Sequence, residues 1–243
     1  MDIVKLGFLY PLGGAEYEHY HFQERLDHRV RTYLTGVRIF GEGSDHDPEH
    51  LKRTGALDNL TQAAVGLKPL APDAALWACT SGSFIDGRAH AEDQAAAIAA
   101  TLGCPASSTS LAFVNAARHL GLKRLALLAT YPKPAAQAFA DFLREFGFEV
   151  GPIAWLDAPA GPDAAAFGVE KVMGALADLD LSGTDGVLIP DTAMPGFELV
   201  RRAEAAFGLP VLAANQVSIW EGLRLANASL ALPGHGRLFA EAV

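Results

Sequence analysis

Short apolar runs that alternate with helical segments dominate this 243-residue chain. Seven runs have the length of a β-strand, at 3–10, 37–41, 74–79, 124–130, 150–156, 186–190 and 210–214. Between the fourth and fifth runs, apolar residues recur at helical spacing from Ala135 to Phe146, and Gly147 follows as a stop. Strands that are apolar throughout are typical of sheets covered on both faces. The alternation therefore predicts an α/β fold built on mainly parallel sheets.

Three pairs of short segments repeat along the chain in the same order. The pairs are LGFL (6–9) with LALL (125–128), DAALWACT (73–80) with DGVLIPDT (185–192), and GCPA (103–106) with GLPV (208–211). The offsets between partners agree to within the length of a loop. Each match alone is weak, but three in one order indicate two related lobes.

The repeat predicts both the domain boundaries and the place of the active site. We expect an N-terminal α/β lobe at 1–118, a second at 119–222, and a C-terminal segment at 223–243 that returns to the first lobe. The two lobes are pseudo-symmetric, each a mainly parallel sheet flanked by helices. Cys79 and Asp191 hold equivalent positions where a strand ends, and each precedes a threonine. Because α/β sheets bind ligands at the carboxyl ends of strands, we expect both residues to face one cleft between the lobes.

Charge and cysteine content exclude several classes of partner. The formal net charge of −9 argues against nucleic acid, because phosphate binding needs a basic surface. No basic run suggests an anionic membrane, and no apolar run approaches the length of a membrane span. The N-terminal stretch lacks the charge-then-apolar order of a signal peptide, and Cys79 and Cys104 make no disulfide framework. We expect a cytoplasmic protein with reduced thiols, in which Cys104 is structural.

Five segments together resemble a known family. They are CTSGSF (79–84), LLATY (127–131), IPDT (189–192), SIWEGLRLA (218–226) and PGHGRLF (233–239). With them the chain is similar to the aspartate/glutamate racemase superfamily, in the branch of arylmalonate decarboxylase and maleate isomerase. The resemblance covers nearly the whole chain. It implies an active site between two lobes, no metal or organic cofactor, a small carboxylate or dicarboxylate substrate, and the homodimer that this family often forms.

The chain departs from this family at the two strand ends. The superfamily's racemases and the maleate isomerases carry a cysteine at both ends, whereas arylmalonate decarboxylases keep only the second. Here the first position is Cys79 and the second is Asp191. By contrast, Thr80, Ser81 and Tyr131 match the residues that hold a substrate carboxylate in the decarboxylases. Thr192, next to Asp191, joins them in the predicted substrate-binding set.

The residue types suit chemistry beside a carboxylate. Removing a proton or CO₂ there puts charge on the carboxylate oxygens, which neutral hydroxyl and N–H donors stabilise. Gly13 and Gly14, after the first strand, can let the backbone approach a ligand closely. A strand-to-helix turn can lower the pKa of the Cys79 thiol, which then gives or takes a proton or attacks an activated double bond. Asp191 can supply the second acid or base if burial raises its pKa.

The histidines offer no recognised metal pattern. His19 and His21 are two apart and do not share a helix face. His46 and His50 are four apart, but a helix that opens at Pro48 leaves His46 outside it. Neither pair comes with further ligands of a known zinc motif. We interpret all four as solvated surface residues.

Three functions remain open from the sequence. The first is a cofactor-independent isomerase, cis–trans or racemase in type, with Cys79 and Asp191 as its catalytic residues. The retained Cys79 favours it. The second is a malonate-type decarboxylase in which Cys79 protonates the enediolate from the face opposite to that used by the known enzymes. The third is a non-catalytic protein that binds a small carboxylate, a reading suggested by the loss of the second cysteine.

Overall fold

Two four-stranded parallel sheets form the centre of the computed structural model, which describes residues 3–26, 28–228 and 231–240. The first sheet has the strand order β2 (Val30–Gly36), β1 (Val4–Tyr10), β3 (Ala74–Trp77) and β4 (Ala106–Ser108). The second has the equivalent order β6 (Glu149–Trp155), β5 (Arg124–Ala129), β7 (Gly186–Ile189) and β8 (Val211–Ala213). The prediction of two pseudo-symmetric α/β lobes is confirmed.

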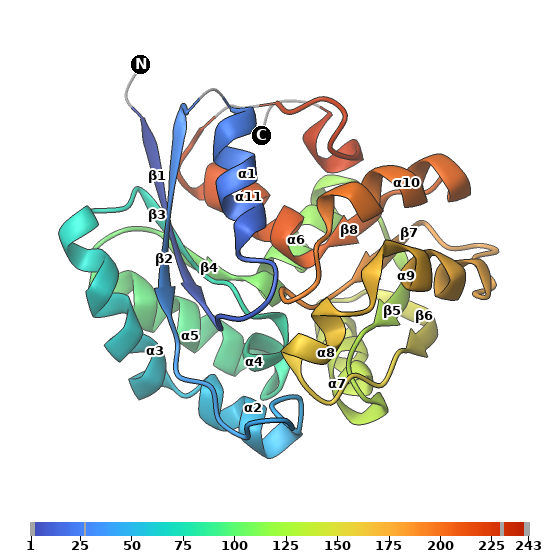
Figure 1. The fold of residues 1–243 in the computed structure, drawn as a ribbon, viewed down its shortest axis with the longest axis horizontal. Coiled ribbons are helices and arrows are strands. Elements are labelled where there is room, and N and C mark those ends of the chain that lie inside the picture. The colour runs from blue at the N-terminus through green and yellow to red at the C-terminus, as the bar shows by residue number, and fades with distance from the viewer. Residues whose placement is uncertain (1–2, 27, 229–230, 241–243) are drawn as a thin grey trace.

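Helices cover both sheets and also lie between them (Figure 1). Those of the first half are α1 (Tyr17–Arg25), α2 (Pro48–Thr54), α3 (Leu57–Ala64), η1 (Val65–Leu70), α4 (Thr80–Phe84), α5 (Gly87–Leu102) and α6 (Thr109–His119). Those of the second are α7 (Lys133–Glu145), α8 (Gly161–Ala165), α9 (Gly168–Ala177), α10 (Phe197–Phe207), α11 (Ala214–Leu225) and η2 (Arg237–Phe239). The expected helix before Gly147 and the helix opening at Pro48 are both present.

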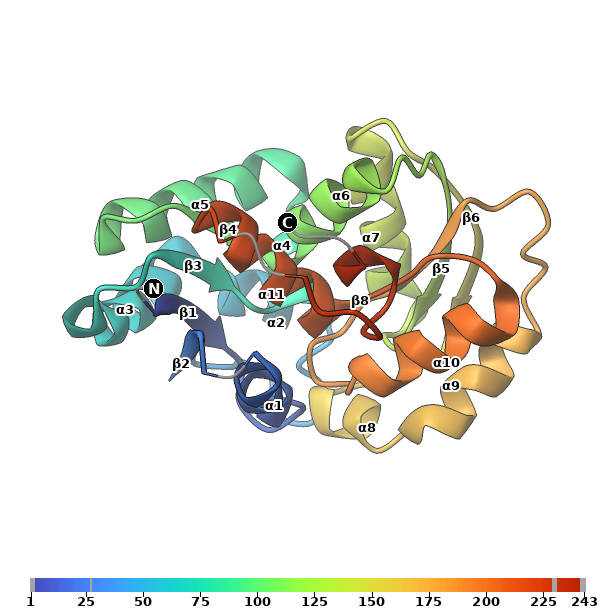
Figure 2. The same ribbon diagram turned by 90° about the horizontal axis from the view of Figure 1, so that it is seen from above.

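The helices α6 and α11 lie between the two sheets (Figure 2). They follow β4 and β8, the last strands of their sheets, and they pack against each other. α11 also contacts β3 and β4 of the first lobe as well as β8. The first ten residues of α11 are all buried, as expected of a helix that contacts protein on every side. The two lobes are therefore joined by a shared layer of helices.

The repeated segments occupy equivalent strands for a structural reason. Asp73 and Asp185 begin the longest repeat, just before β3 and β7. The carboxylate of Asp73 accepts a hydrogen bond from the Lys5 N–H at 2.7 Å, and that of Asp185 accepts one from the Arg124 N–H at 2.8 Å. Each aspartate thus joins the start of one central strand to its neighbour. The repeated aspartate serves strand pairing, and the chemistry lies at the other end of the repeat.

The strand predictions failed at two places. The run 37–41 is not a strand, and the strand beside β1 is β2, at 30–36. β2 is an edge strand with partly exposed side chains, so its sequence is more polar than a doubly covered strand. β4 was not predicted because it has only three residues, two of them serines. Both errors concern the edges of the first sheet.

The C-terminal segment packs beside the first helix. Phe239 in η2 lies 5.7 Å from Phe22 in α1, measured between ring centroids. Residues 229–230 and 241–243 of the predicted segment lie outside the described residues. The largest apolar cluster includes Leu6 and Leu76 of the first sheet together with Leu125 of the second. The lobes share this core, and the proposed boundaries at 118 and 222 stay a prediction. Within the described part of the chain, no helix is long and apolar enough to cross a membrane.

Candidate active site

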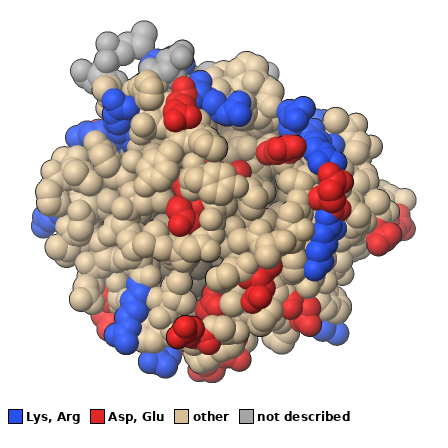
Figure 3. All heavy atoms as spheres, in the orientation of Figure 1, with Lys and Arg blue, Asp and Glu red and all other residues tan. Residues whose placement is uncertain are grey.

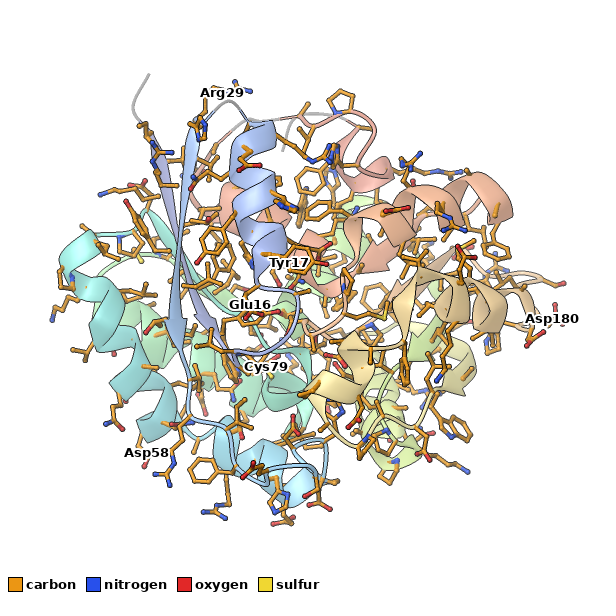
Figure 4. The ribbon with its side chains drawn as sticks, viewed as in Figure 1. Glu16, Tyr17, Arg29, Asp58, Cys79 and Asp180 are labelled. Atoms are coloured by element: carbon orange, nitrogen blue, oxygen red, sulfur yellow. The ribbon has the colours of Figure 1, made fainter. Side chains whose placement is uncertain are left out.

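A cavity of about 480 Å³ opens where the carboxyl ends of the two sheets meet. Its walls come from the loops after β1, β2 and β3 in the first lobe and after β5, β6 and β7 in the second. All eight residues predicted as site residues line it, namely Gly13, Gly14, Cys79, Thr80, Ser81, Tyr131, Asp191 and Thr192. In Figure 4 the labelled Cys79 lies near the centre of the view, where the two lobes meet. The volume suits a small organic molecule.

Cys79 caps the short helix α4. Its backbone is extended, and its Sγ accepts a hydrogen bond from the Gly82 N–H at 3.3 Å. The Ser81 hydroxyl lies 3.6 Å from the same sulfur. Burial raises the pKa of the thiol to about 11, although the contacts with Gly82 and Ser81 oppose this shift. The expectation of a lowered pKa was therefore wrong, because α4 is short and the sulfur is withdrawn from water.

Three hydroxyl groups lie beside the thiol. Thr80 and Ser81 follow Cys79 in the first turn of α4, and Tyr131 comes from the loop after β5. Tyr131 is 1 % exposed, and its hydroxyl has no well-aligned hydrogen-bond partner among the described residues. Burial and the nearby Asp191 carboxylate raise the pKa of Tyr131 well above its usual value. A buried O–H donor therefore lies at the cavity wall beside the Thr80 and Ser81 hydroxyls, without a well-aligned partner in the described part of the chain.

Asp191 holds the equivalent strand end of the second lobe. Its φ of 104° lies outside the regions that most side chains adopt, and Asp is among those that tolerate it best. One carboxylate oxygen accepts from the Thr130 hydroxyl at 2.6 Å, and the other accepts from the Ala193 N–H at 2.9 Å. Burial raises the pKa of Asp191, while His46 and these donors oppose the rise. The direction is the one that an acid at this position requires.

Two of the four histidine predictions were wrong. His46 is 5 % exposed and lines the cavity, with its Nε2 3.9 Å from Asp191 Oδ2. His19 is fully buried between Phe8 and Tyr10, and its pKa is lowered to about 4 by burial. His21 is exposed as expected, whereas His50 is half-buried against the carbonyl of Ser44. No local pattern marks His46, because residues 158 and 159 of the other lobe hold it in place.

Gly14 permits a close approach between the loop after β1 and the loop after β7. A Cβ on Gly14 would lie 2.5 Å from the Cα of Ala193, so only glycine fits there without a shift. The N–H groups of Gly13 and Gly14 are held by the Glu16 carboxylate, at 3.3 and 2.8 Å. These N–H groups are thus engaged within the protein. Glu16 is labelled in Figure 4, close above Cys79 in that view.

Buried contacts between the lobes fix the loop that carries Asp191 and Thr192. The Tyr10 hydroxyl donates to the carbonyl of Thr192, and the Asn215 amide donates to it at 3.1 Å. The buried Glu18 carboxylate accepts from the N–H groups of Gly196 and Phe197, at 2.8 and 3.0 Å. Residues distant in sequence therefore set the geometry of this loop.

Carboxylates gather at the rim of the cavity. Glu42, Asp45 and Asp163 line it together with Asp191, and its described lining includes no lysine or arginine. Figure 3 shows acidic side chains grouped in the lower centre of the face, over α2, the loop before it and α8. An anion that enters the cavity therefore depends on neutral donors deep in the site. Among the residues that the structure describes, no group of three or more His, Cys, Asp or Glu side chains is placed to hold a metal ion.

Comparison with known proteins decides the family. The family model described as arylmalonate decarboxylase matches residues 51–239. The chain belongs to this family. It is 31% identical to a maleate isomerase of Nocardia farcinica over 70% of each chain. It is 30% identical to the arylmalonate decarboxylase of Bordetella bronchiseptica, over 67% of this chain and 69% of that one.

Solved structures of family members match nearly the whole chain. A maleate isomerase of Pseudomonas putida S16, crystallised with maleate, superposes with a TM-score of 0.90 at 21% identity. That match covers 99% of this chain and 98% of the other, and it shows the shared fold. A cysteine-to-serine mutant of the Nocardia farcinica maleate cis–trans isomerase superposes with a TM-score of 0.89 at 26% identity, over 98% of each chain. Its structure contains a covalently bound succinylcysteine intermediate.

Proposed function

We propose that this member of the arylmalonate decarboxylase family is a cis–trans isomerase of a small unsaturated carboxylic acid, with Cys79 as nucleophile. One observation carries the proposal: the Cys79 thiol and the unpartnered Tyr131 hydroxyl line one buried cavity. The succinylcysteine intermediate of the Nocardia farcinica enzyme supports a covalent route. The proposed substrate class, a small dicarboxylic acid, follows the relatives named for maleate and arylmalonate.

In the proposed reaction, the hydroxyls of Thr80, Ser81 and Tyr131 hold one carboxylate of the substrate. The Cys79 sulfur, once deprotonated, forms a C–S bond to the β-carbon of the double bond. The π electrons move into the α-carbon and its carboxylate, where the hydroxyl donors stabilise the growing charge. The former double bond is then single and rotates. Elimination reforms the double bond in the trans geometry and releases the sulfur.

The test uses maleate and nuclear magnetic resonance. The wild-type protein should convert maleate to fumarate, and intact-mass spectrometry should detect the maleate adduct on Cys79. Cys79→Ala should lose both the conversion and the adduct, whereas Cys104→Ala should keep both, because Cys104 lies outside the cavity. Fumarate formation by Cys79→Ala at the wild-type rate would refute the proposal.

The second candidate is decarboxylation of an arylmalonate, favoured by the family match and the protonated state of the thiol. With a pKa near 11, Cys79 is a thiol at neutral pH and can give a proton to an enediolate left by CO₂ loss. Methylphenylmalonate distinguishes the two candidates, because a decarboxylase releases CO₂ from it and an isomerase does not. A protein that binds maleate and phenylmalonate without turning over either is the non-catalytic carboxylate binder.

A further inference from the structure

Across the cavity from Cys79, two ionisable side chains, Asp191 and His46, lie beside each other against the second lobe. Each carboxylate oxygen of Asp191 already accepts a hydrogen bond, from the Thr130 hydroxyl and from the Ala193 N–H. The carboxylate is thereby fixed in one orientation, at the end of a strand and in a turn with φ of 104°. Its position suits a fixed negative charge better than a group that must approach a substrate carbon.

His46 is held from three sides by the second lobe. Its backbone N–H donates to the Pro159 carbonyl at 3.1 Å, and its Nδ1 lies 2.9 Å from the Ala158 carbonyl oxygen. The edge of its ring meets the Tyr131 ring, with centroids 4.9 Å apart. Because a carbonyl oxygen only accepts, Nδ1 must carry a hydrogen. In the neutral ring, the second nitrogen, Nε2, therefore holds the free lone pair.

Nε2 is also the atom placed for chemistry. It lies 3.9 Å from Asp191 Oδ2, which is beyond hydrogen-bond distance but close enough for the carboxylate to stabilise a positive ring. His46 lines the cavity together with Cys79, although His46 comes from the loop between β2 and α2 and Cys79 from the end of β3. The thiol thus lies at the strand end of the first lobe, and the imidazole of His46 reaches from a first-lobe loop to Asp191 at the strand end of the second lobe.

We propose that His46 is the proton-carrying catalytic residue across the cavity from Cys79 and that Asp191 is its positioning residue; this rests on the isomerase function proposed above. The proton of the Cys79 thiol passes through solvent to His46 Nε2, leaving a thiolate and an imidazolium. Sulfur bonds to the β-carbon, the π pair moves to the α-carbon, and Nε2 gives its proton to that carbon. After rotation, Nε2 removes a proton from the α-carbon. The electron pair of that C–H bond forms the new double bond, and the C–S bond breaks to release the Cys79 thiolate, which regains a proton from the imidazolium through solvent.

The experiment follows maleate in deuterated water. Fumarate made by the wild-type protein should carry deuterium on its vinyl carbon. His46→Asn keeps a side-chain donor for the Ala158 carbonyl but has no group that titrates, and it should reduce both kcat and deuterium incorporation by about 10²-fold or more. His50→Asn is the matched control, since His50 lies four residues away and does not line the cavity. It should behave as the wild-type protein does.

Chemical rescue separates a catalytic role from a structural one. His46→Ala leaves space for a free imidazole, which should raise its rate in proportion to the imidazole concentration and leave His50→Ala unchanged. Wild-type activity in His46→Asn overturns the assignment of His46 and leaves the isomerase proposal standing. Loss of activity without rescue by imidazole also overturns the assignment, because it indicates a structural role.

A second probe keeps the two proposals apart. If the wild-type protein does not isomerise maleate, exchange of the α-hydrogens of succinate with deuterated water is measured instead. Exchange that is present in the wild-type protein and lost in His46→Asn supports His46 and overturns only the isomerase. Absence of both reactions in the wild-type protein overturns both proposals.

Discussion

The two lobes share one strand order but differ at the strand ends that face the cavity. After β3, Cys79 caps a helix that begins at the next residue, and its sulfur accepts the Gly82 N–H. After β7, Asp191 starts a turn with positive φ, and α10 begins only at Phe197. The first end therefore presents a thiol among hydroxyls. The second presents a carboxylate in contact with loops of both lobes.

The two lobes thus share a backbone arrangement but carry different reactive groups at the equivalent strand ends. The repeated Asp73 and Asp185 perform the same structural task in both lobes, at the ends of the strands remote from the cavity. At the cavity, the equivalent positions have diverged into a buried thiol and a buried carboxyl group, and burial raises the pKa of both. A site with two unlike ends can add a sulfur and a proton to a substrate from different directions.

The largest expected effect concerns the protonation of the thiol. Because burial raises the pKa of Cys79 to about 11, only about one thiol in 10³ is ionised at pH 8. In Cys104→Ser, alkylation by iodoacetamide should therefore accelerate roughly tenfold per pH unit from pH 8 to about pH 10.5. The formation of alkylated protein is followed by mass spectrometry. An alkylation rate that stops rising below pH 9 would show that the Cys79 thiol is already ionised there. The strand end of the first lobe would then not carry a neutral thiol.

The next effect concerns the hydroxyl set on the thiol side. Tyr131→Phe removes a donor that has no well-aligned protein partner in the described part of the chain, so it should lower kcat/KM by about 10²-fold, or about 3 kcal/mol of barrier. Its free energy of unfolding should not fall. The matched variant is Tyr10→Phe, whose hydroxyl donates to the Thr192 carbonyl and should contribute about 1 kcal/mol to stability. Equal loss of stability in both variants would contradict an unused Tyr131 hydroxyl.

The third prediction concerns Asp191, at the strand end of the second lobe. Replacing it should lower activity less than the Tyr131 change does, and it should raise stability. Burial raises the folded-state pKa of Asp191 above its unfolded value, so its contribution to stability is full below about pH 3.9 and is lost as pH rises through the folded pKa. Asp191→Asn removes this cost and tolerates the positive φ. At pH 7 it should melt a few degrees higher than the wild-type protein, at about 2–4 °C per kcal/mol. Its kcat should fall about tenfold or more because the negative charge is gone.

Calorimetry across pH checks the sign of this prediction. The difference in melting temperature between Asp191→Asn and the wild-type protein should shrink as the pH falls below about 3.9, where the wild-type carboxyl becomes protonated in both the folded and the unfolded state. Glu198→Gln, at an exposed position of α10, is the control and should show no such trend. A wild-type protein that is the more stable of the pair at pH 7 would mean that the donors around Asp191 outweigh its burial.

How much of this the sequence predicted depends on the range of the interactions. Cys79 and Asp191 were found because a buried strand and its repeat are local patterns, and the carboxyl end of a parallel strand has a defined place in the fold. His46 was missed because its burial comes from carbonyls 112 and 113 residues away, and nothing in the run around it records that contact. The raised pKa of Cys79 was missed for the same reason, since solvent exclusion depends on both lobes. The edge strand β2 was not predicted because a half-exposed strand has no continuous apolar run.

The smallest expected effect comes from the rim, where the two lobes are alike in charge. Glu42 of the first lobe and Asp163 of the second both line the cavity, so each should repel a dianionic substrate before it reaches the hydroxyls. Glu42→Gln should therefore lower the KM for maleate by about two- to threefold at low salt, with kcat unchanged. Glu49→Gln removes an exposed carboxylate from α2 that does not line the cavity, and it should leave KM unchanged. Raising the ionic strength should erase the gain, since exposed charges are screened. If Glu42→Gln instead raises the KM for maleate, Glu42 supports the shape of the binding site, and repulsion by the rim does not limit binding.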